Sequence, residues 1–430
     1  MTARTAFVNA RLIDPASGFD GAGALLVEDG KIADLGPRLF NDAKPAGAEI
    51  VDCQGKVLTP GLIDLRVFTG EPGAEHRETL ASASASAASG GVTSFAMMPA
   101  TDPVIDDAAL VDFIARRAAA NARVRIYPMA ALTKGLNGTQ MSEIGLLKEA
   151  GAIAFTDADR TVASSLIMRR CLAYAANFDA LVVAHAEDPA LAAAGHMNEG
   201  AFAARMGLGG IPAAAEAIAV ERDIRLVELT GARYHLGQVS TAAALEVIAK
   251  AKARGLPVTC SVSAHHLVLN EQDVGEYKTF AKVSPALRSE DDRKAMVEGV
   301  RAGTIDTIVS SHDPQAPETK RLPFAQAAYG AVGLETLLPA ALSLHHDAHV
   351  PLIDVLRSLT INAANILRLA QGRLAKGAPA DLMLFDPASP IKIDATQFRS
   401  HSKNSPFHGR LMQGRVLRTV VGGKTVFSAT

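Results

Sequence analysis

Residues 92–121 read VTSFAMMPATDPVIDDAALVDFIARRAAAN, a short apolar run followed by an amphipathic segment. The run Val92–Met98 has the length and composition of a buried strand. The segment Asp107–Asn121 carries its apolar residues at helical spacing. A strand followed by a helix is the unit that builds parallel sheets, because the helix carries the chain back to the start of the next strand. This stretch therefore predicts a β/α unit.

The same order of elements recurs along the middle of the chain. We predict strands at Val124–Met129, Ala152–Phe155, Ala180–His185, Arg233–Leu236, Val258–Val262 and Thr307–Ser310, and helical segments at Met141–Ala150, Val162–Asn177 and Ile211–Thr230. Seven or eight such units favour a closed (β/α)8 TIM-type barrel over an open sheet. No G-x-G-x-x-G motif follows a strand to support a dinucleotide-binding fold. In a barrel, the residues at the C-terminal ends of the strands form the site.

Both ends of the chain have the pattern of short strands and turns. The strand candidates are Ala6–Ile13, Ala24–Glu28, Lys31–Leu35, Asp381–Phe385, Arg415–Val421 and Lys424–Phe427. We therefore expect an α/β protein in which residues 59–368 form the barrel. Residues 1–58 and 369–430 are expected to form a small β-sandwich domain from both termini.

The composition excludes several classes of protein. With 430 residues, the chain is long enough for a barrel and an accessory domain. Its net charge of −2 creates no field that would gather nucleic acid or acidic lipid. The three cysteines, Cys53, Cys171 and Cys260, lack the paired spacing of disulfides or zinc knuckles. Since neither a secretory signal nor an apolar run of about 20 residues is visible, we expect a cytoplasmic protein.

One family accounts for many segments of the chain at once. The segments Pro60–Leu65 and Glu71–Thr79 resemble the first barrel strand and following loop of dihydroorotases of the long bacterial type, in the amidohydrolase superfamily. Further similar segments follow in the same order. They are Gly90–Thr93, Met98–Pro99, Ala154–Asp157, Gly207–Glu216, Leu287–Glu290, Gly330–Thr336, Gly377–Leu382 and Ser402–Phe407. The resemblance implies a barrel hydrolase that opens or closes a cyclic amide at one or two metal ions, which activate water and polarise the carbonyl group.

Most of the metal ligands that the resemblance implies are replaced. Arg66 and Phe68 stand where the family has His-x-His, and neither a guanidinium nor a phenyl ring can ligate a metal. Gln238 replaces the histidine after the sixth strand, and an amide is a poor zinc ligand. Ser311 replaces the aspartate that is both ligand and general base.

Two ligand positions are retained. Asp157 matches the bridging carboxylate of the family, and His185 matches the histidine at the end of the fifth strand. Two ligands are too few for a stable site, so we interpret them as vestigial. We favour a structural role for both, because a single buried histidine at a strand end is more often a hydrogen-bonded core residue.

The substrate contacts that the resemblance implies are replaced as well. The family's arginine, two asparagines and a histidine correspond to Gly70, Ala100, Ser284 and Gln315. A change of substrate would keep the catalytic groups and alter the pocket, whereas this sequence has changed both.

Three further groups have open interpretations. His265 and His266 follow a strand, but the resembling enzymes carry a similar pair outside the metal site, so we treat both as structural. Asp313 lies two residues beyond the lost aspartate and could replace it, although the proline that follows favours a loop. Arg66 could pair with Asp157 or bind an anion in the pocket.

Our leading interpretation is a non-catalytic dihydroorotase-like protein of pyrimidine biosynthesis, with no cofactor expected. The resemblance implies a partner, the catalytic chains of aspartate carbamoyltransferase, whose assembly or activity the chain would support as a homo-oligomer or hetero-oligomer. The first alternative is a weak or altered cyclic amidohydrolase that converts carbamoyl-aspartate to dihydroorotate, with Asp157, His185 and Asp313 around one zinc ion. The second is a binding module in which Arg66 holds an anionic metabolite.

Overall fold

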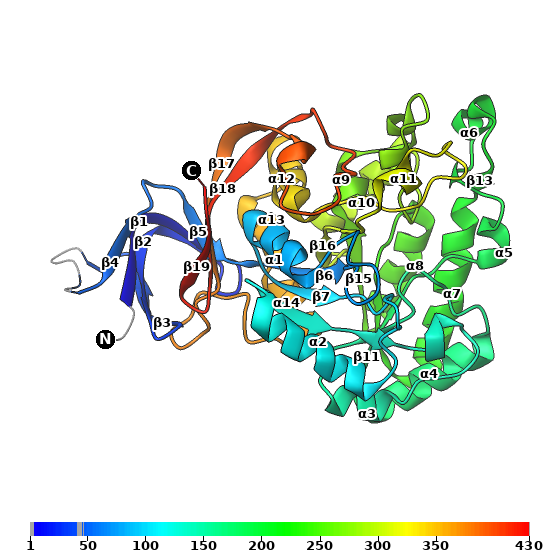
Figure 1. Cartoon of the computed structure of the whole chain (residues 1–430), viewed down its shortest axis with the longest axis horizontal. Helices are drawn as coiled ribbons and strands as arrows, with labels where there is room; N and C mark the ends of the chain where they lie inside the picture. Colours follow the sequence, from blue (N-terminus) through cyan, green and yellow to red (C-terminus); the bar gives the residue numbers. More distant parts are fainter. Residues whose placement is uncertain (1–3, 41–44, 46, 430) are drawn as a thin grey trace.

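The computed structural model describes residues 4–40, 45 and 47–429. A β-rich part that contains both described ends of the chain lies beside a larger α/β part (Figure 1). No helix in the described residues is long and apolar enough to cross a membrane. The cysteines Cys53, Cys171 and Cys260 are buried and free.

The α/β part is built around parallel strands. They are β6 (Leu62–Val67), β7 (Val92–Met97), β8 (Arg125–Pro128), β9 (Ala130–Ala131), β10 (Phe155–Thr156), β11 (Leu181–Ala184), β14 (Arg233–Leu236), β15 (Val258–Ser263) and β16 (Thr307–Val309). The strands β6-β7-β8 form one sheet, and β9-β10-β11-β14-β15-β16 form another. Since only Met129 separates β8 from β9, these two act as one interrupted barrel strand.

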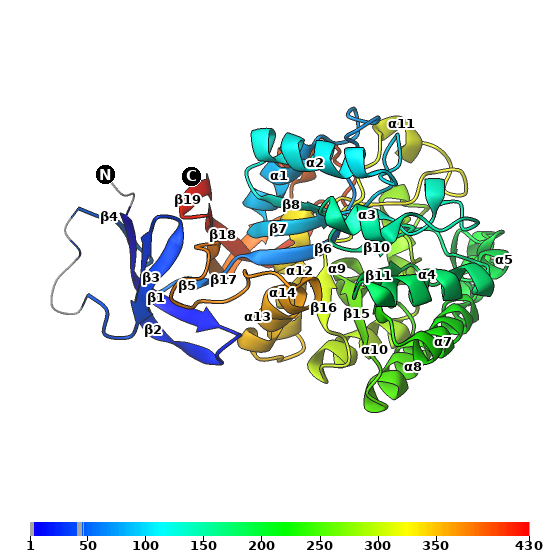
Figure 2. The same cartoon turned by 90° about the horizontal axis from the view of Figure 1, so that it is seen from below.

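The circle of strands closes between β6 and β16. Val67 and His312 form a parallel bridge, and the Phe68 amide donates a hydrogen bond to the His312 carbonyl oxygen at 2.8 Å. The predicted (β/α)8 barrel is therefore confirmed. Its strands lie in the middle of Figure 2, with helices on both sides.

The longer helices surround this barrel. They are α1 (Leu80–Ser89), α2 (Ala108–Asn121), α3 (Ile144–Glu149), α4 (Ser165–Asn177), α7 (Ala213–Thr230), α8 (Ala242–Ala253), α10 (Glu290–Arg301), α12 (Leu337–His346), α13 (Leu352–Leu359) and α14 (Ile361–Leu367). The short helices are α5 (Pro189–Ala192), α6 (Ala201–Met206), α9 (Ala264–Val268) and α11 (Pro317–Lys320), and a two-residue pair, β12 (Met197–Asn198) and β13 (Gly210–Ile211), lies among them.

Side-chain caps set where two predicted helices begin. The Asp107 carboxylate accepts a hydrogen bond from the Ala109 amide, so the predicted segment starts with its N-cap. The Ser164 hydroxyl caps α4 in the same way and accepts from the Ile167 amide. The prediction of a helix from Val162 is therefore three residues too early.

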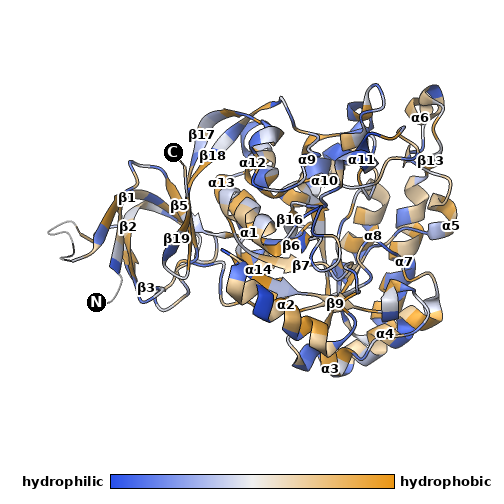
Figure 3. Ribbon diagram, in the orientation of Figure 1, coloured by the Kyte–Doolittle hydropathy of each residue, from blue (hydrophilic) through white to orange (hydrophobic). Residues whose placement is uncertain are grey.

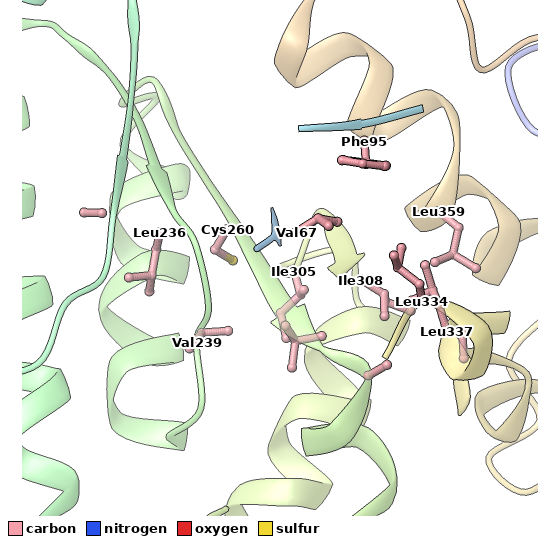
Figure 4. Close-up of a cluster of buried hydrophobic side chains, with 14 of the residues drawn as sticks. Val67, Phe95, Leu236, Val239, Cys260, Ile305, Ile308, Leu334, Leu337 and Leu359 are labelled. Carbon is pink, nitrogen blue, oxygen red and sulfur yellow. The ribbon is translucent and has the colours of Figure 1, made fainter. Parts of the chain in front are cut away.

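Apolar side chains fill the space between strands and helices. Val67, Leu236 and Ile308 on the strands are fully buried, as are Leu337 of α12 and Leu359 of α13 (Figure 4). Burying a side chain of this size stabilises the fold by about 1.5–3 kcal/mol. The outer helices α2 and α4 carry both hydrophilic and hydrophobic residues, which is typical of helices with one face on a core (Figure 3).

Strands from both ends of the chain share one sheet. Within the described residues it has eight strands, in the order β19-β18-β17-β5-β1-β2-β3 with β4 beside β1. Their bounds are β1 (Arg4–Asp14), β2 (Phe19–Glu28), β3 (Lys31–Gly36), β4 (Glu49–Asp52), β5 (Val57–Pro60), β17 (Leu382–Lys392), β18 (Leu411–Val421) and β19 (Lys424–Ser428). The predicted β-rich unit from both termini is therefore confirmed, while its exact boundaries stay a prediction.

Candidate active site at the barrel mouth

The carboxyl ends of the barrel strands bring together four side chains from distant parts of the chain. They are Arg66 in β6, Asp159 after β10, His185 after β11 and Asp313 after β16. Burial is the largest influence on the pKa values of both His185 and Asp313, and the charges of Arg66 and Asp159 act on both as well. Because all four stand at or just beyond the carboxyl ends of parallel strands, they lie at one end of the barrel, where the sites of barrel enzymes lie.

Arg66 is buried at this end, with 4% of its surface exposed. Its Nη1 donates a long hydrogen bond of 3.4 Å to the Ala158 carbonyl oxygen, and its guanidinium lies 5.2 Å from the centre of the Phe68 ring. Its Nε is buried without a hydrogen-bond partner. Burial lowers the pKa of Arg66, but a guanidinium with so high an ordinary pKa remains a cation at neutral pH.

His185 presents a neutral ring to a cavity. Burial, together with the charge of Arg66, lowers the pKa of His185 to about 4. No hydrogen bond to this ring occurs within the described part of the chain, and the ring lines a cavity of about 540 Å³. This differs from the hydrogen-bonded core role that we expected. The neutral histidine can accept a hydrogen bond from a bound molecule.

Asp157 turns away from the other site residues. Its carboxylate accepts hydrogen bonds from the Thr133 amide, at 2.8 Å, and from the Thr133 hydroxyl. The expected alternative of an ion pair between Asp157 and Arg66 does not occur among the described residues. The aspartate therefore fixes the loop after β9 and is not a group of the pocket.

Asp159 lines the cavity, whereas Asp157, which matches the family's bridging carboxylate, does not. The intervening Ala158 has a φ of 61°, which turns the chain so that the exposed Asp159 lines the cavity. The sequence patterns did not single out Asp159. The Asp-Ala-Asp spacing was the available signal, since either carboxylate could have faced the barrel mouth.

Asp313 lies in a loop, as the following proline suggested, and its carboxylate nevertheless faces the site. It accepts hydrogen bonds from Arg77 Nη2 at 3.2 Å and from Gln315 Nε2 at 2.7 Å. Burial raises the pKa of Asp313 to about 6, while Arg77 opposes the rise. A carboxyl group with this pKa can both release and accept a proton near neutral pH.

The side chains at the four replaced ligand positions do not fit a metal ion. Arg66 is a cation, Phe68 is apolar, and Gln238 Nε2 donates a hydrogen bond of 2.8 Å to Ser311 Oγ. A cation repels a metal ion, and a neutral amide and hydroxyl that bind each other are poor zinc ligands. Among the residues that the structure describes, no group of three or more His, Cys, Asp and Glu side chains is placed to hold a metal ion.

The replaced substrate positions have different surroundings. A Cβ atom on Gly70 would lie 1.9 Å from the Ala74 carbonyl oxygen, so the loop leaves no room for a side chain there. Ala100 packs against a small apolar cluster beside β7, and Ser284 lines the cavity. Gln315 is engaged with Asp313 through its side chain.

The cavity also has a basic wall. Lys282 lines it, and its Nζ lies 4.5 Å from the centre of the Tyr329 ring. This ammonium donates hydrogen bonds to the carbonyl oxygens of Phe324 and Ala325, at 2.8 and 3.0 Å. Burial lowers the pKa of Lys282 to about 8. No sequence motif singled out this lysine.

His265 and His266 have the contacts of core residues. The His265 ring stacks on Phe407, with 5.5 Å between the ring centres, and the His266 ring lies 3.1 Å from the Ala286 carbonyl oxygen. Burial lowers the pKa of His265 to about 3 and that of His266 to about 4. Both rings are therefore neutral parts of the packing.

Comparison with known proteins gives a family for this architecture. Residues 55–244 match the dihydro-orotase-like family, and residues 330–427 match an amidohydrolase family. The dihydroorotase of Ehrlichia canis (strain Jake) is 47% identical over 99% of this chain and 95% of its own length. The dihydroorotase of Syntrophus aciditrophicus (strain SB) is 42% identical over 97% of both chains.

Solved structures show the same architecture. The L-hydantoinase (dihydropyrimidinase) of Arthrobacter aurescens superimposes with a TM-score of 0.88 at 26% identity, over 99% of this chain and 96% of its own. A D-hydantoinase from a Thermus species has a TM-score of 0.81 at 22% identity over 98% and 94%, which supports the fold alone.

These relatives overturn the leading interpretation of a non-catalytic chain. Proteins named dihydroorotase match the chain over nearly their whole length at 42–47% identity. The interpretation of the chain as a non-catalytic protein with only a supporting role was therefore wrong. The error arose because we inferred a loss of activity from the loss of metal ligands. Missing metal ligands remove one set of donors, whereas titratable groups such as Asp313 and His185 still converge on the barrel mouth. The chain belongs to the dihydroorotase family of the amidohydrolase superfamily.

Proposed function

We propose that this chain is a dihydroorotase that interconverts carbamoyl-aspartate and dihydroorotate. The observation that carries this proposal is the 47% identity to the Ehrlichia canis dihydroorotase over 99% of the chain. The same reaction was the first alternative in the sequence analysis. The barrel-mouth residues support it because they supply groups that can transfer protons and bind anions.

The reaction sets two chemical requirements. Ring closure joins a urea nitrogen of carbamoyl-aspartate to a carboxyl carbon and releases water, and ring opening adds water to the same amide bond. Both directions move protons, so a group that titrates near neutral pH is needed. Both also place negative charge on the oxygen of the reacting carbonyl, which a nearby cation stabilises.

Asp313 is the group that we assign to proton transfer. Its pKa of about 6 lets the carboxylate accept a proton at neutral pH and return it later. Arg77 orients the carboxylate through the 3.2 Å hydrogen bond. A second bond, 2.9 Å long, from Arg77 Nε to the Pro314 carbonyl oxygen holds the arginine in place. The neutral ring of His185 lines the cavity and can accept a hydrogen bond from a bound substrate.

A metal ion has no place in this assignment. The first alternative included zinc around Asp157, His185 and Asp313, but Asp157 is bound to Thr133. The side chains at the barrel mouth do not fit a metal ion, so we assign no step of the reaction to one. The expectation that the chain needs no cofactor followed from the non-catalytic interpretation and has no support in the comparisons.

The test is turnover of dihydroorotate and of carbamoyl-aspartate by the purified full chain, after chelator treatment and again with added zinc. We expect turnover in both samples, and a loss of about 10²–10⁴-fold in Asp313→Asn. Asp112→Asn is the matched control, because Asp112 is exposed and pairs only with Arg116 on the surface of α2. Absence of turnover in either direction, with and without zinc, would contradict the proposal.

The association with aspartate carbamoyltransferase catalytic chains stays a prediction. It rests on the resemblance alone, and it does not depend on whether the chain is active. Co-purification of the full chain with that enzyme, followed by measurement of the complex mass, tests it.

A further inference from the structure

Arg66 is a buried cation without an anionic partner. Only 4% of its surface is exposed, its Nε has no hydrogen bond, and its one side-chain hydrogen bond has a length of 3.4 Å. No ion pair to Arg66 occurs among the described residues. Burying a charge is unfavourable unless it is paired, so this guanidinium is suited to an anion that binds from outside.

Two of the three nearby carboxylates are bound to other groups. Asp64 accepts hydrogen bonds from the amides of Arg66 and Ser310, at 3.1 and 3.3 Å, and is buried under the strand ends. Asp313 binds Arg77 and Gln315. Asp159, Asp313 and Asp64 attract the Arg66 cation, but none of them forms an ion pair with its guanidinium among the described residues. Nε and Nη2 therefore keep no anionic partner within that part of the chain.

The guanidinium crosses the barrel mouth. It starts from β6, and its Nη1 reaches the Ala158 carbonyl oxygen after β10. A Cβ atom on Gly237, after β14, would lie 3.9 Å from the same Nη1. The same Cβ atom would lie 3.3 Å from the Ala184 carbonyl oxygen. Ala158 and Ala184 directly precede Asp159 and His185, which line the 540 Å³ cavity, so the guanidinium lies close to one side of that cavity.

We propose that Arg66 is the centre of a carboxylate-binding site that holds one carboxylate of carbamoyl-aspartate, or of a similar small dicarboxylate, without a metal ion. The planar guanidinium matches a carboxylate through two parallel hydrogen bonds. Lys282 and Arg160 line the cavity and add positive charge to it, beside the carboxylates of Asp159 and Glu187. The choice of carbamoyl-aspartate as ligand rests on the proposed function, whereas the carboxylate chemistry does not.

The test measures binding instead of turnover. The chelator-treated full chain is titrated calorimetrically with carbamoyl-aspartate and with 3-ureidopropionate, which has the same chain but lacks one carboxylate. We expect carbamoyl-aspartate to bind at least tenfold more tightly, and this preference to disappear in Arg66→Met. Arg116→Met, which changes an exposed arginine of α2, is the matched control and should keep the preference.

Each outcome decides the proposal. Equal affinity of the two ligands for the unchanged chain would overturn it, as would tight binding of carbamoyl-aspartate by Arg66→Met. The comparison of ligands on the unchanged chain needs no variant, so it remains decisive if Arg66→Met fails to fold. Preferential binding without any turnover would support this site and contradict the proposed function. Turnover that is insensitive to Arg66→Met would overturn the site alone.

Discussion

Gln238 and Ser311 bind each other across the barrel mouth, with 2.8 Å between Nε2 and Oγ. One residue follows β14 and the other follows β16, so the bond joins the ends of two strands that are separated by β15. Both side chains are buried. A neutral pair of this kind can close the end of the barrel without any metal ion.

This bond predicts a stability effect at Ser311. The change Ser311→Ala leaves a buried amide donor of Gln238 without a partner, which costs about 1–3 kcal/mol. Urea unfolding of the full chain should show a decrease of that size in the free energy of unfolding. Ser428→Ala on β19 is the control, since Ser428 is exposed. Unchanged stability in Ser311→Ala would show that another group takes up the donor.

The pH dependence of activity should follow Asp313. Its pKa is raised from 3.8 to about 6, so the carboxylate that accepts protons is lost as the pH falls below about 6. We expect kcat/KM to fall about tenfold for each pH unit below that value and to level off above it. The contribution of Asp313 to the stability of the fold has the opposite pH dependence. It is greatest below pH 3.8 and is lost as the pH rises through about 6. A rate profile that is flat between pH 5 and pH 7 would contradict the assignment.

Arg77 should set the pH at which kcat/KM begins to fall. It lowers the pKa of Asp313, so Arg77→Met should move the acidic limb of the kcat/KM profile to higher pH. A role limited to loop structure would reduce the rate without moving the limb. Arg116→Met serves as the comparison, because Arg116 is exposed and distant in sequence from the loop. The readout is the midpoint of the limb in the two variants.

The strands of the barrel could be predicted because their residues are buried on both faces. Apolar runs such as Ala180–His185 coincide with β11, which spans Leu181–Ala184. The predicted helix Met141–Ala150 is shorter in the structure, at Ile144–Glu149. Its first residues pair with the loop after β9, since the Ser142 amide donates to the Leu132 carbonyl oxygen. The spacing of apolar residues in the sequence gives no signal of such a contact.

The site could be predicted only in part. The positions of Arg66 and His185 follow from strand ends, because parallel strands bring those ends to one mouth. The orientation of Asp157 depends on Thr133, which is 24 residues away, and on the turned backbone of Ala158. Neither leaves a signal in local sequence. The functional error had a separate origin, since we treated the loss of metal ligands as a loss of chemistry.

The loop at Gly70 leads to a last prediction. Its amide donates to the Glu78 carbonyl oxygen at 2.8 Å, and its own carbonyl oxygen accepts from the Ala74 amide at 2.6 Å. A Cβ atom there would lie 1.9 Å from the Ala74 carbonyl oxygen, which belongs to the backbone and cannot move aside alone. Gly70→Ala should therefore destabilise the chain by about 1–3 kcal/mol. It should also lower activity, because Arg77 in the same loop would shift from Asp313.

Gly200→Ala is the matched control, since a Cβ atom there meets only Glu271 Oε2, at 4.0 Å. Both variants are compared by urea unfolding and by kcat/KM at pH 7. If Gly70→Ala is as stable and as active as Gly200→Ala, then the loop can open at no cost. In that case the tight fold of residues 70–79 is not what holds Arg77 against Asp313.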